Sequence, residues 1–173
     1  MVSALAARQS LVLDQIKVAE KSNEIIAILK QLDMMAIEGA IVTIDAMGCQ
    51  RDIARKIIDQ KADYVLARRG NQGSLCEDVE FFVTEQKARA FADTPISQDT
   101  TIDADHGHIE TRTTTAIHDV ERLRQRHDWP GLDAIVIVDS TREINNRVEK
   151  ETCFYITSLV LLANLLGPIV RSH

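Results

Sequence analysis

Ile41-Val42-Thr43-Ile44-Asp45, followed by Ala46-Met47-Gly48-Cys49-Gln50, is the stretch of this 173-residue chain that decides the fold. Its apolar run is rich in β-branched residues, which favour buried strands, and it stops abruptly at a carboxylate. In open α/β sheets, ligands bind in the crevice at the carboxyl ends of the strands. An acid placed there is suited to hold a metal ion or to act as a general base. An Asp that only turns the chain or caps the next helix has the same pattern.

The segments on both sides of this strand predict alternating strands and helices. Residues 11–16 and 63–67 have the composition of strands. Between the strands, apolar residues at helical spacing predict helices over residues 22–35 and 52–61. Strand–helix–strand–helix–strand order is a βαβ pattern, so we expect parallel pairing around residues 41–45 and an α/β fold.

The second half of the chain predicts a β-rich organisation. Helices are expected from Ser74 to Phe91 and, as an apolar segment, from Ser158 to Leu166. Residues 93–105 are polar and acidic and contain a proline, which predicts a surface loop. Three strands are expected at His108–His118, Ala134–Ser140 and Glu149–Ile156, with a hairpin turn around Asn145-Asn146.

Seven short motifs, in a fixed order, carry a resemblance to a known family. They are Lys21-Ser22-Asn23-Glu24-Ile25, the stretch from Gly39 to Gln50, Asp63-Tyr64-Val65-Leu66-Ala67, Gly70-Asn71-Gln72, His106-Gly107-His108-Ile109-Glu110-Thr111-Arg112, Trp129-Pro130-Gly131 and Tyr155-Ile156-Thr157-Ser158-Leu159. Together they resemble insertion-sequence transposases of the H-repeat-associated type, which carry a DDE catalytic domain. The resemblance covers the chain from Leu11 to His173.

This resemblance implies a ribonuclease-H-like fold in which two Asp and one Glu bind Mg²⁺ or Mn²⁺. Asp45 matches the second Asp of the family and is therefore the expected catalytic residue and metal ligand. The resemblance implies that the first Asp of the family belongs to a segment upstream of Met1. The Glu lies in a motif that begins Arg-x-His-Trp, where this chain reads Arg171-Ser172-His173. We therefore expect a central fragment of the catalytic domain that is inactive in isolation.

The family also implies a division of the chain into three parts. Residues 1–72 are expected to form an incomplete ribonuclease-H-like core that lacks the first strand or strands and the Glu-bearing helix. Residues 73–157 are expected to form an insertion subdomain of a helix, an acidic loop and antiparallel strands. Residues 158–173 are then the start of the final helical segment of the core.

Five residues are candidates for contact with DNA: Arg68, Arg69, Asn71, Gln72 and Arg112. Arginine side chains bind phosphate groups, and a Gly-containing turn after a strand allows backbone amides to approach a phosphate or a base. The same turn can also be a plain entry to a helix. The family commonly has Lys before Gly-Asn-Gln, and Arg where this chain has His108.

The segment that includes His106 and His108 has the spacing of metal ligands, but no third strong ligand lies near it in sequence. We therefore favour a non-metal role for both histidines. Glu110 and Arg112 fall on one face of the same predicted strand, which predicts a structural ion pair or an approach to DNA.

Composition limits the class of protein. The net charge is −6; residues 1–72 carry ten Lys or Arg and nine Asp or Glu, while residues 73–173 carry ten and seventeen. Nucleic-acid-binding domains are usually basic, so this charge argues weakly against an independent DNA-binding module. The three widely spaced cysteines predict reduced thiols, and we find neither a signal peptide nor a membrane span. These features predict a cytoplasmic protein, and the resemblance to insertion-sequence transposases implies a bacterial one.

The expected partners are transposon-end DNA in the intact enzyme, and a second copy of this chain or the full-length transposase. Oligomerisation is expected because a core without its first strand exposes a sheet edge. Two other functions stay open. One is a non-enzymatic remnant that binds DNA or inhibits the transposase, and the other is a small metal-dependent α/β hydrolase.

Overall fold

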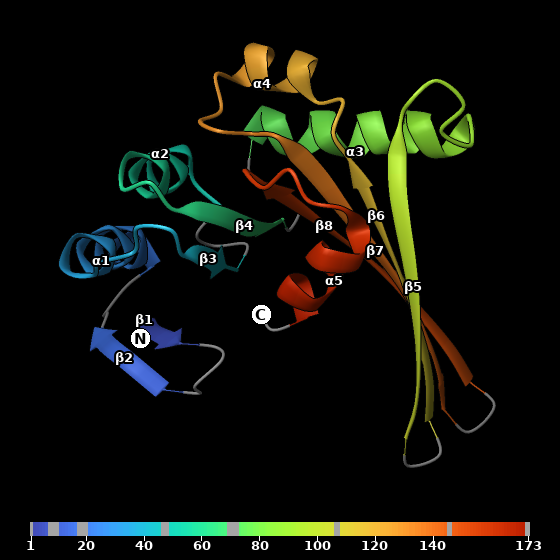
Figure 1. Cartoon of the computed structure of the whole chain (residues 1–173), viewed down its shortest axis with the longest axis horizontal. Helices are drawn as coiled ribbons and strands as arrows, with labels where there is room; N and C mark the ends of the chain where they lie inside the picture. Colours follow the sequence, from blue (N-terminus) through green and yellow to red (C-terminus); the bar gives the residue numbers. More distant parts are fainter. Residues whose placement is uncertain are drawn as a thin grey trace.

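A computed structural model of the chain describes residues 2–6, 11–16, 21–45, 49–68, 73–105, 108–144 and 147–171. Side chains are described within residues 24–45, 49–67, 75–104, 109–143 and 147–171. Figure 1 shows a twisted sheet with helices on both faces, from which four strands extend as a long antiparallel ribbon. In the described part of the chain, no helix has the length and apolarity that a membrane crossing requires.

The main sheet is mixed and has the strand order β3-β4-β8-β7-β6-β5. Its parallel pair consists of β3 (Ile41–Ile44) and β4 (Asp63–Arg68), and they are joined through α2 (Arg51–Asp59). Two β-rich segments separated by an amphipathic helix predict this arrangement, so the expected parallel pairing at residues 41–45 is confirmed. The α/β class is confirmed with it.

The other four strands are antiparallel neighbours. They are β5 (Ile96–Asp105), β6 (His108–Ile117), β7 (Ala134–Ile144) and β8 (Arg147–Thr157). The loop predicted over residues 93–105 is therefore wrong, because ten residues of this segment pair in continuous register with β6. β5 is an edge strand whose outer half is solvated on both faces. Its sequence consequently lacks the apolar alternation that marks a half-buried strand.

One further prediction fails near the N-terminus. The strand expected at residues 11–16 is present as β2 (Leu11–Ile16), but it pairs antiparallel with β1 (Val2–Ala6) in a separate two-stranded sheet. Consequently the main sheet ends at β3 on this side. A strand-like sequence identifies an extended segment but does not identify its neighbour, which long-range packing selects.

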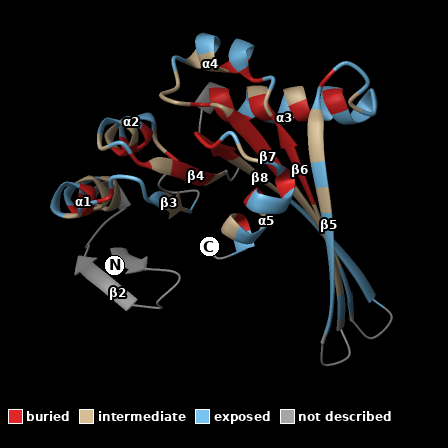
Figure 2. Ribbon diagram, viewed as in Figure 1, coloured by how far each residue is buried: buried red, intermediate tan, exposed pale blue. Residues whose placement is uncertain are grey.

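Helices cover the two faces of the main sheet unequally. The larger core lies under α1 (Lys21–Met34), α2, α3 (Gly73–Ala88) and α4 (Glu121–His127), and it includes Tyr64, Leu66 and Ile137. The smaller core lies under α5 (Ala163–Arg171) and includes Val65, Ala116 and Val136. Successive residues of β4 thus enter different cores, as the alternation of side chains along a strand requires. Figure 2 shows both cores as buried segments at the centre of the sheet.

The joint between β4 and β8 is fixed by two hydroxyl side chains. Thr157 Oγ1 donates to the buried carbonyl of Tyr64 at 2.6 Å and accepts from the amide of Leu159 at 3.0 Å. Ser158 Oγ accepts from the amide of Tyr64 at 3.0 Å and donates to Asp63 at 2.8 Å. Because these bonds hold residues 157–159 against β4, the final helix begins at Ala163 and not at Ser158 as its apolar sequence predicts.

The turn after α4 packs against the same joint. The hydroxyl of buried Tyr64 donates to the carbonyl of Pro130 at 2.8 Å. Gly131 has a φ of +63°, and a Cβ at this position would lie 2.8 Å from Cδ1 of Ile58. Glycine is therefore required here both for the backbone conformation and for the close approach of α2.

The predicted boundaries of the three parts, after residues 72 and 157, stay a prediction. In the structure, β4 from the first part pairs with β8 from the second over Val65–Arg68 and Phe154–Thr157. The two parts therefore share one hydrogen-bonded sheet.

We expect Thr157→Val to lower the free energy of unfolding by about 1–3 kcal/mol, because at nearly constant volume it removes a hydroxyl that donates to the buried carbonyl of Tyr64 and accepts from the amide of Leu159. Urea unfolding followed by circular dichroism measures the change. Ser140→Ala is the matched control, since that hydroxyl makes only an exposed 3.4 Å bond to the carbonyl of Glu151. An equal loss in both variants would contradict the proposed importance of the joint.

Candidate functional site

The carboxyl ends of the two parallel strands form the candidate site. Ile44, the last residue of β3, pairs with Leu66, so Asp45 follows beside the Ala67–Arg68 end of β4. Asp45 is exposed. In a parallel pair this edge also collects the loops that follow each strand, which is why it commonly holds the chemistry of α/β proteins. The structure thus places Asp45 where the sequence pattern puts it.

Tyr155 is the nearest large polar side chain in the next strand, since it pairs with Ala67 across the β4–β8 joint. It is half-buried against the smaller core. Burial raises the pKa of Tyr155 to about 12, Cys153 adds to the increase, and the Arg112 guanidinium opposes it. Burial also raises the pKa of Tyr64 far above its usual value. Both hydroxyls therefore stay protonated at neutral pH.

A divalent metal would require more ligands than this edge displays. Mg²⁺ and Mn²⁺ prefer oxygen ligands, and a two-metal site for DNA chemistry needs several convergent carboxylates. Among the described residues, no group of three or more His, Cys, Asp or Glu side chains is placed to hold a metal ion. The described residues alone therefore do not complete a metal site around Asp45.

Four of the five predicted DNA contacts belong to the segment that begins at the end of β4. Arg68 ends β4, and its backbone pairs with Phe154 of β8. Its side chain lies outside the described part, as do Arg69, Asn71 and Gln72. The same holds for His106 and for the side chain of His108.

Arg112 lies elsewhere, on β6. Four strand spacings separate β3 from β6, so Arg112 is on the order of 20 Å from Asp45. Its guanidinium donates to Glu110 at 2.9 Å, which confirms the predicted ion pair. The pair lines a hollow of about 510 Å³ with four more charged side chains and a serine: Ser140, Arg142, Glu149, Lys150 and Glu151. Since the three acids balance the three bases, this hollow lacks the positive charge that phosphate binding needs.

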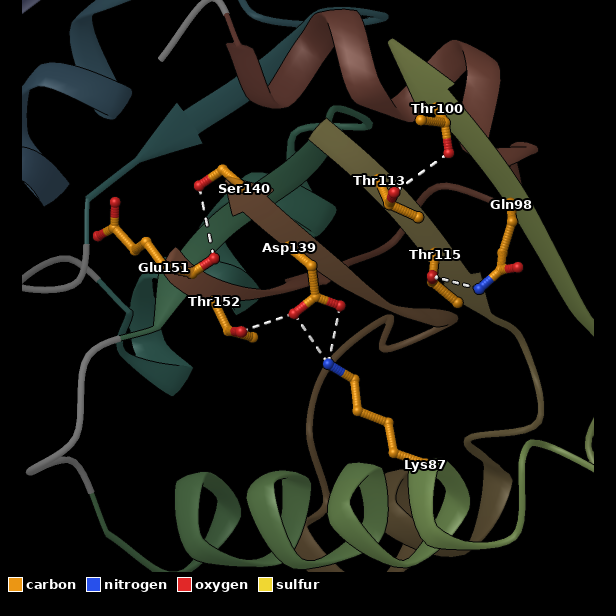
Figure 3. Close-up of polar contacts among 9 residues, drawn as sticks. All are labelled: Lys87, Gln98, Thr100, Thr113, Thr115, Asp139, Ser140, Glu151 and Thr152. Carbon is orange, nitrogen blue, oxygen red and sulfur yellow. Dashed lines mark hydrogen bonds and ion pairs between the residues drawn. The ribbon is translucent and has the colours of Figure 1, made fainter. Parts of the chain in front are cut away.

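One charged residue on the opposite face of the sheet was not singled out from the sequence. Asp139 on β7 accepts from Lys87 of α3 at 2.8 and 2.9 Å and from Thr152 of β8 at 2.6 Å (Figure 3). Next to it, Thr100 and Thr113 share a hydrogen bond of 3.1 Å, and Gln98 donates to Thr115 at 3.0 Å. All of these partners are internal to the sheet and its helix, which indicates a structural role. The register of the strands brings these residues together, and the sequence pattern does not predict that register.

Comparison with known proteins gives a consistent result. The chain is 38% identical over 181 aligned positions to the H repeat-associated putative transposase YhhI of Escherichia coli (strain K12), which covers 100% of this chain and 46% of YhhI. It is 53% identical over 75 residues to the H repeat-associated putative transposase YbfD of the same strain, covering 43% of this chain and 30% of YbfD. The resemblance to H-repeat-associated transposases is confirmed.

Another relative of this transposase-like chain has no activity in its name. An uncharacterized protein in the dhlA 3′ region of Xanthobacter autotrophicus is 40% identical over 158 residues, which covers 91% of this chain and 52% of the relative. The chain therefore spans about half the length of the curated relatives it matches. No family model and no solved structure matches it.

Titration of the two tyrosines gives a direct test of the burial of Tyr64 and Tyr155. An ordinary tyrosine, with a pKa near 10, is mostly ionised at pH 11. We expect little phenolate absorbance near 295 nm at pH 11 in the folded chain, and its full appearance on unfolding in guanidinium. Because the folded pKa of Tyr155 is raised, its contribution to stability is complete below about pH 10 and is lost as the pH rises toward 12.

Tyr155→Phe supplies the control for this titration. It should remove the component that titrates near pH 12 and should weaken the fall in stability between pH 10 and 12. Phenolate absorbance that rises with an ordinary midpoint near pH 10 while the chain remains folded would contradict the burial of both tyrosines.

Proposed function

We propose that this chain is the central part of the catalytic domain of a DDE transposase with a ribonuclease-H-like fold. In this proposal Asp45 supplies one of the carboxylates that hold Mg²⁺ or Mn²⁺, and residues outside the described part supply the others. The intact enzyme would cleave and join DNA strands at transposon ends. The single observation that carries the proposal is the place of Asp45 at the carboxyl end of a parallel strand, in a chain that resembles transposases.

Several features of the chain support this assignment. DNA strand transfer needs metal-bound oxygens more than it needs a nucleophilic side chain, so an exposed carboxylate at a sheet edge suits the chemistry. The matched relatives are about twice as long as this chain, which suits a domain that requires further residues for activity. The isolated chain is therefore proposed to be inactive in DNA cleavage.

Binding of Mn²⁺ to the chain tests the role of Asp45. In ¹H–¹⁵N NMR spectra, we expect a substoichiometric amount of Mn²⁺ to broaden the amide signals of Ile44, Asp45 and Ala67 most strongly. Asp45→Asn should reduce this broadening by about tenfold or more, because a carboxylate is the stronger ligand for a hard cation. Asp59→Asn, an exposed acid at the end of α2, is the matched control and should leave it unchanged.

Broadening centred on another acidic segment, or unaffected by Asp45→Asn, would contradict the assignment of Asp45.

Cleavage of supercoiled DNA tests the inactivity of the chain by itself. We expect no nicking with Mn²⁺. Nicking that disappears in Asp45→Asn would instead show that the chain holds a complete site.

For DNA binding we propose that the residues after β4 contribute more than the extended strands. The four antiparallel strands carry eight Asp or Glu and four Arg or Lys, and Arg112 is already neutralised by Glu110. Phosphate contacts are therefore expected from Arg68 and Arg69, with further contacts from Asn71 and Gln72.

Fluorescence anisotropy with duplex DNA at several salt concentrations measures this difference. We expect Arg69→Gln to weaken binding and to reduce the slope of log K against log salt by about 0.9, which is the value for one phosphate contact. Arg112→Gln should change both quantities less. An equal or larger effect of Arg112→Gln would move the DNA interface to the extended strands.

A further inference from the structure

The outer part of the four antiparallel strands extends beyond the helices. We call this part the blade: residues 100–105 of β5, 108–113 of β6, 139–144 of β7 and 147–152 of β8. Figures 1 and 2 show that its exposed strands extend past the helices that cover the two faces of the sheet. On one face, the contact between Lys87 at the end of α3 and Asp139 marks the last tie to a helix (Figure 3). A sheet is normally stabilised by burying at least one of its faces.

The two faces of the blade differ in chemistry. One face carries the charged hollow with Glu110 and Arg112. The other face, which we call the isoleucine face, consists of two rows of four side chains in register: Ile102, Thr111, Thr141 and Lys150, followed by Ala104, Ile109, Glu143 and Val148.

Three large apolar side chains on the isoleucine face are exposed. Ile102 is 67% exposed, Ile109 46% and Val148 58%. Single exposed apolar residues are ordinary, but three on one face of a sheet that no described helix covers form a patch that favours association. In these two rows the charged residues are Glu143 and Lys150, one of each sign, and both are exposed. Asp139 lies in the next row of the same face, toward the helices, where it is paired with Lys87. Lys150, on the outer strand β8, also borders the charged hollow of the other face.

We propose that the isoleucine face binds the isoleucine face of a second copy of this chain. The twofold axis of this dimer lies between the two stacked sheets, perpendicular to the strands and midway between the two rows. Each row of one copy therefore stacks on the other row of the second copy. Ile102 then lies over Ala104 of the second copy and beside its Ile109. Lys150 comes beside Glu143 of the second copy, about one strand spacing away. Both apolar and ionic contacts are thus satisfied by one symmetric, isologous arrangement.

The charge of the blade argues against DNA as its partner, and its area sets the strength of the proposed dimer. The blade's strands are acidic in sum, which disfavours DNA on this face. Four strands and two to three rows cover about 300–400 Å² per copy, below the roughly 800 Å² per partner of a standard interface. The dimer is therefore weak and concentration-dependent. This inference does not rest on the catalytic proposal, because neither Asp45 nor a metal takes part.

Sedimentation velocity of the full chain tests the dimer over concentrations from about 5 to about 500 µM, the range suited to weak association. We expect the weight-average sedimentation coefficient to rise with concentration toward that of a dimer. Ile109→Glu should abolish the rise, because it places two like charges in the interface. Val160→Glu is the matched control; Val160 is 72% exposed but lies outside the blade, so its substitution should leave the rise intact.

Charge reversal provides the sharper test. Glu143→Lys and Lys150→Glu should each prevent self-association, because every cross-copy pair then carries like charges. An equimolar mixture of the two variants should regain the dimer, since both pairs are again opposite in sign. These surface substitutions leave the core intact, so circular dichroism should match that of the unmodified chain.

Three results would overturn the proposal. The first is a sedimentation coefficient that stays at the monomer value across the concentration range. The second is self-association of Ile109→Glu equal to that of the unmodified chain, which would place the interface elsewhere, for instance at the β3 edge. The third is a mixture of the charge variants that remains monomeric, which would exclude the twofold pairing of Glu143 with Lys150.

Discussion

The pairing of β4 with β8 is the constraint on which the rest of the structure depends. It joins the parallel pair of the main sheet to the antiparallel strands, and it brings together residues about ninety positions apart. Thr157 and Ser158 satisfy the buried backbone of Tyr64, and the hydroxyl of Tyr64 in turn holds the turn at Pro130. Because buried backbone groups are costly to leave unpaired, these bonds fix the register as well as the contact.

This joint brings together three of the motifs that carry the family resemblance, although they are far apart in sequence. Asp63–Ala67 lies within β4, Tyr155–Leu159 contains the end of β8 and the two residues after it, and Trp129–Gly131 lies in the turn that contacts both. Their contacts pack the parallel pair against the antiparallel strands. The exposed Asp45 is therefore supported by a packed scaffold, which is a general requirement for a site whose ligands must converge.

The candidate site was predictable where local pattern was sufficient. The apolar run before Asp45 identified a strand that ends in an acid, and spacing by two residues identified the Glu110–Arg112 pair. The anchoring of Asp139 by Lys87 and Thr152 could not be predicted, because its partners come from another helix and another strand. The distance between Arg112 and Asp45 likewise depends on strand order, which the sequence pattern does not contain.

The sequence by itself determined the α/β class, the parallel pair around residues 41–45, most helices and the resemblance to H-repeat-associated transposases. Each of these follows from short-range periodicity or from motifs that stand in order. Only the tertiary structure decided that residues 96–105 form an edge strand, that β2 pairs with β1, and that none of the described helices packs on the isoleucine face. Edge strands and solvated ribbons gain their stability from neighbours distant in sequence, so their own residues need not carry a buried stripe.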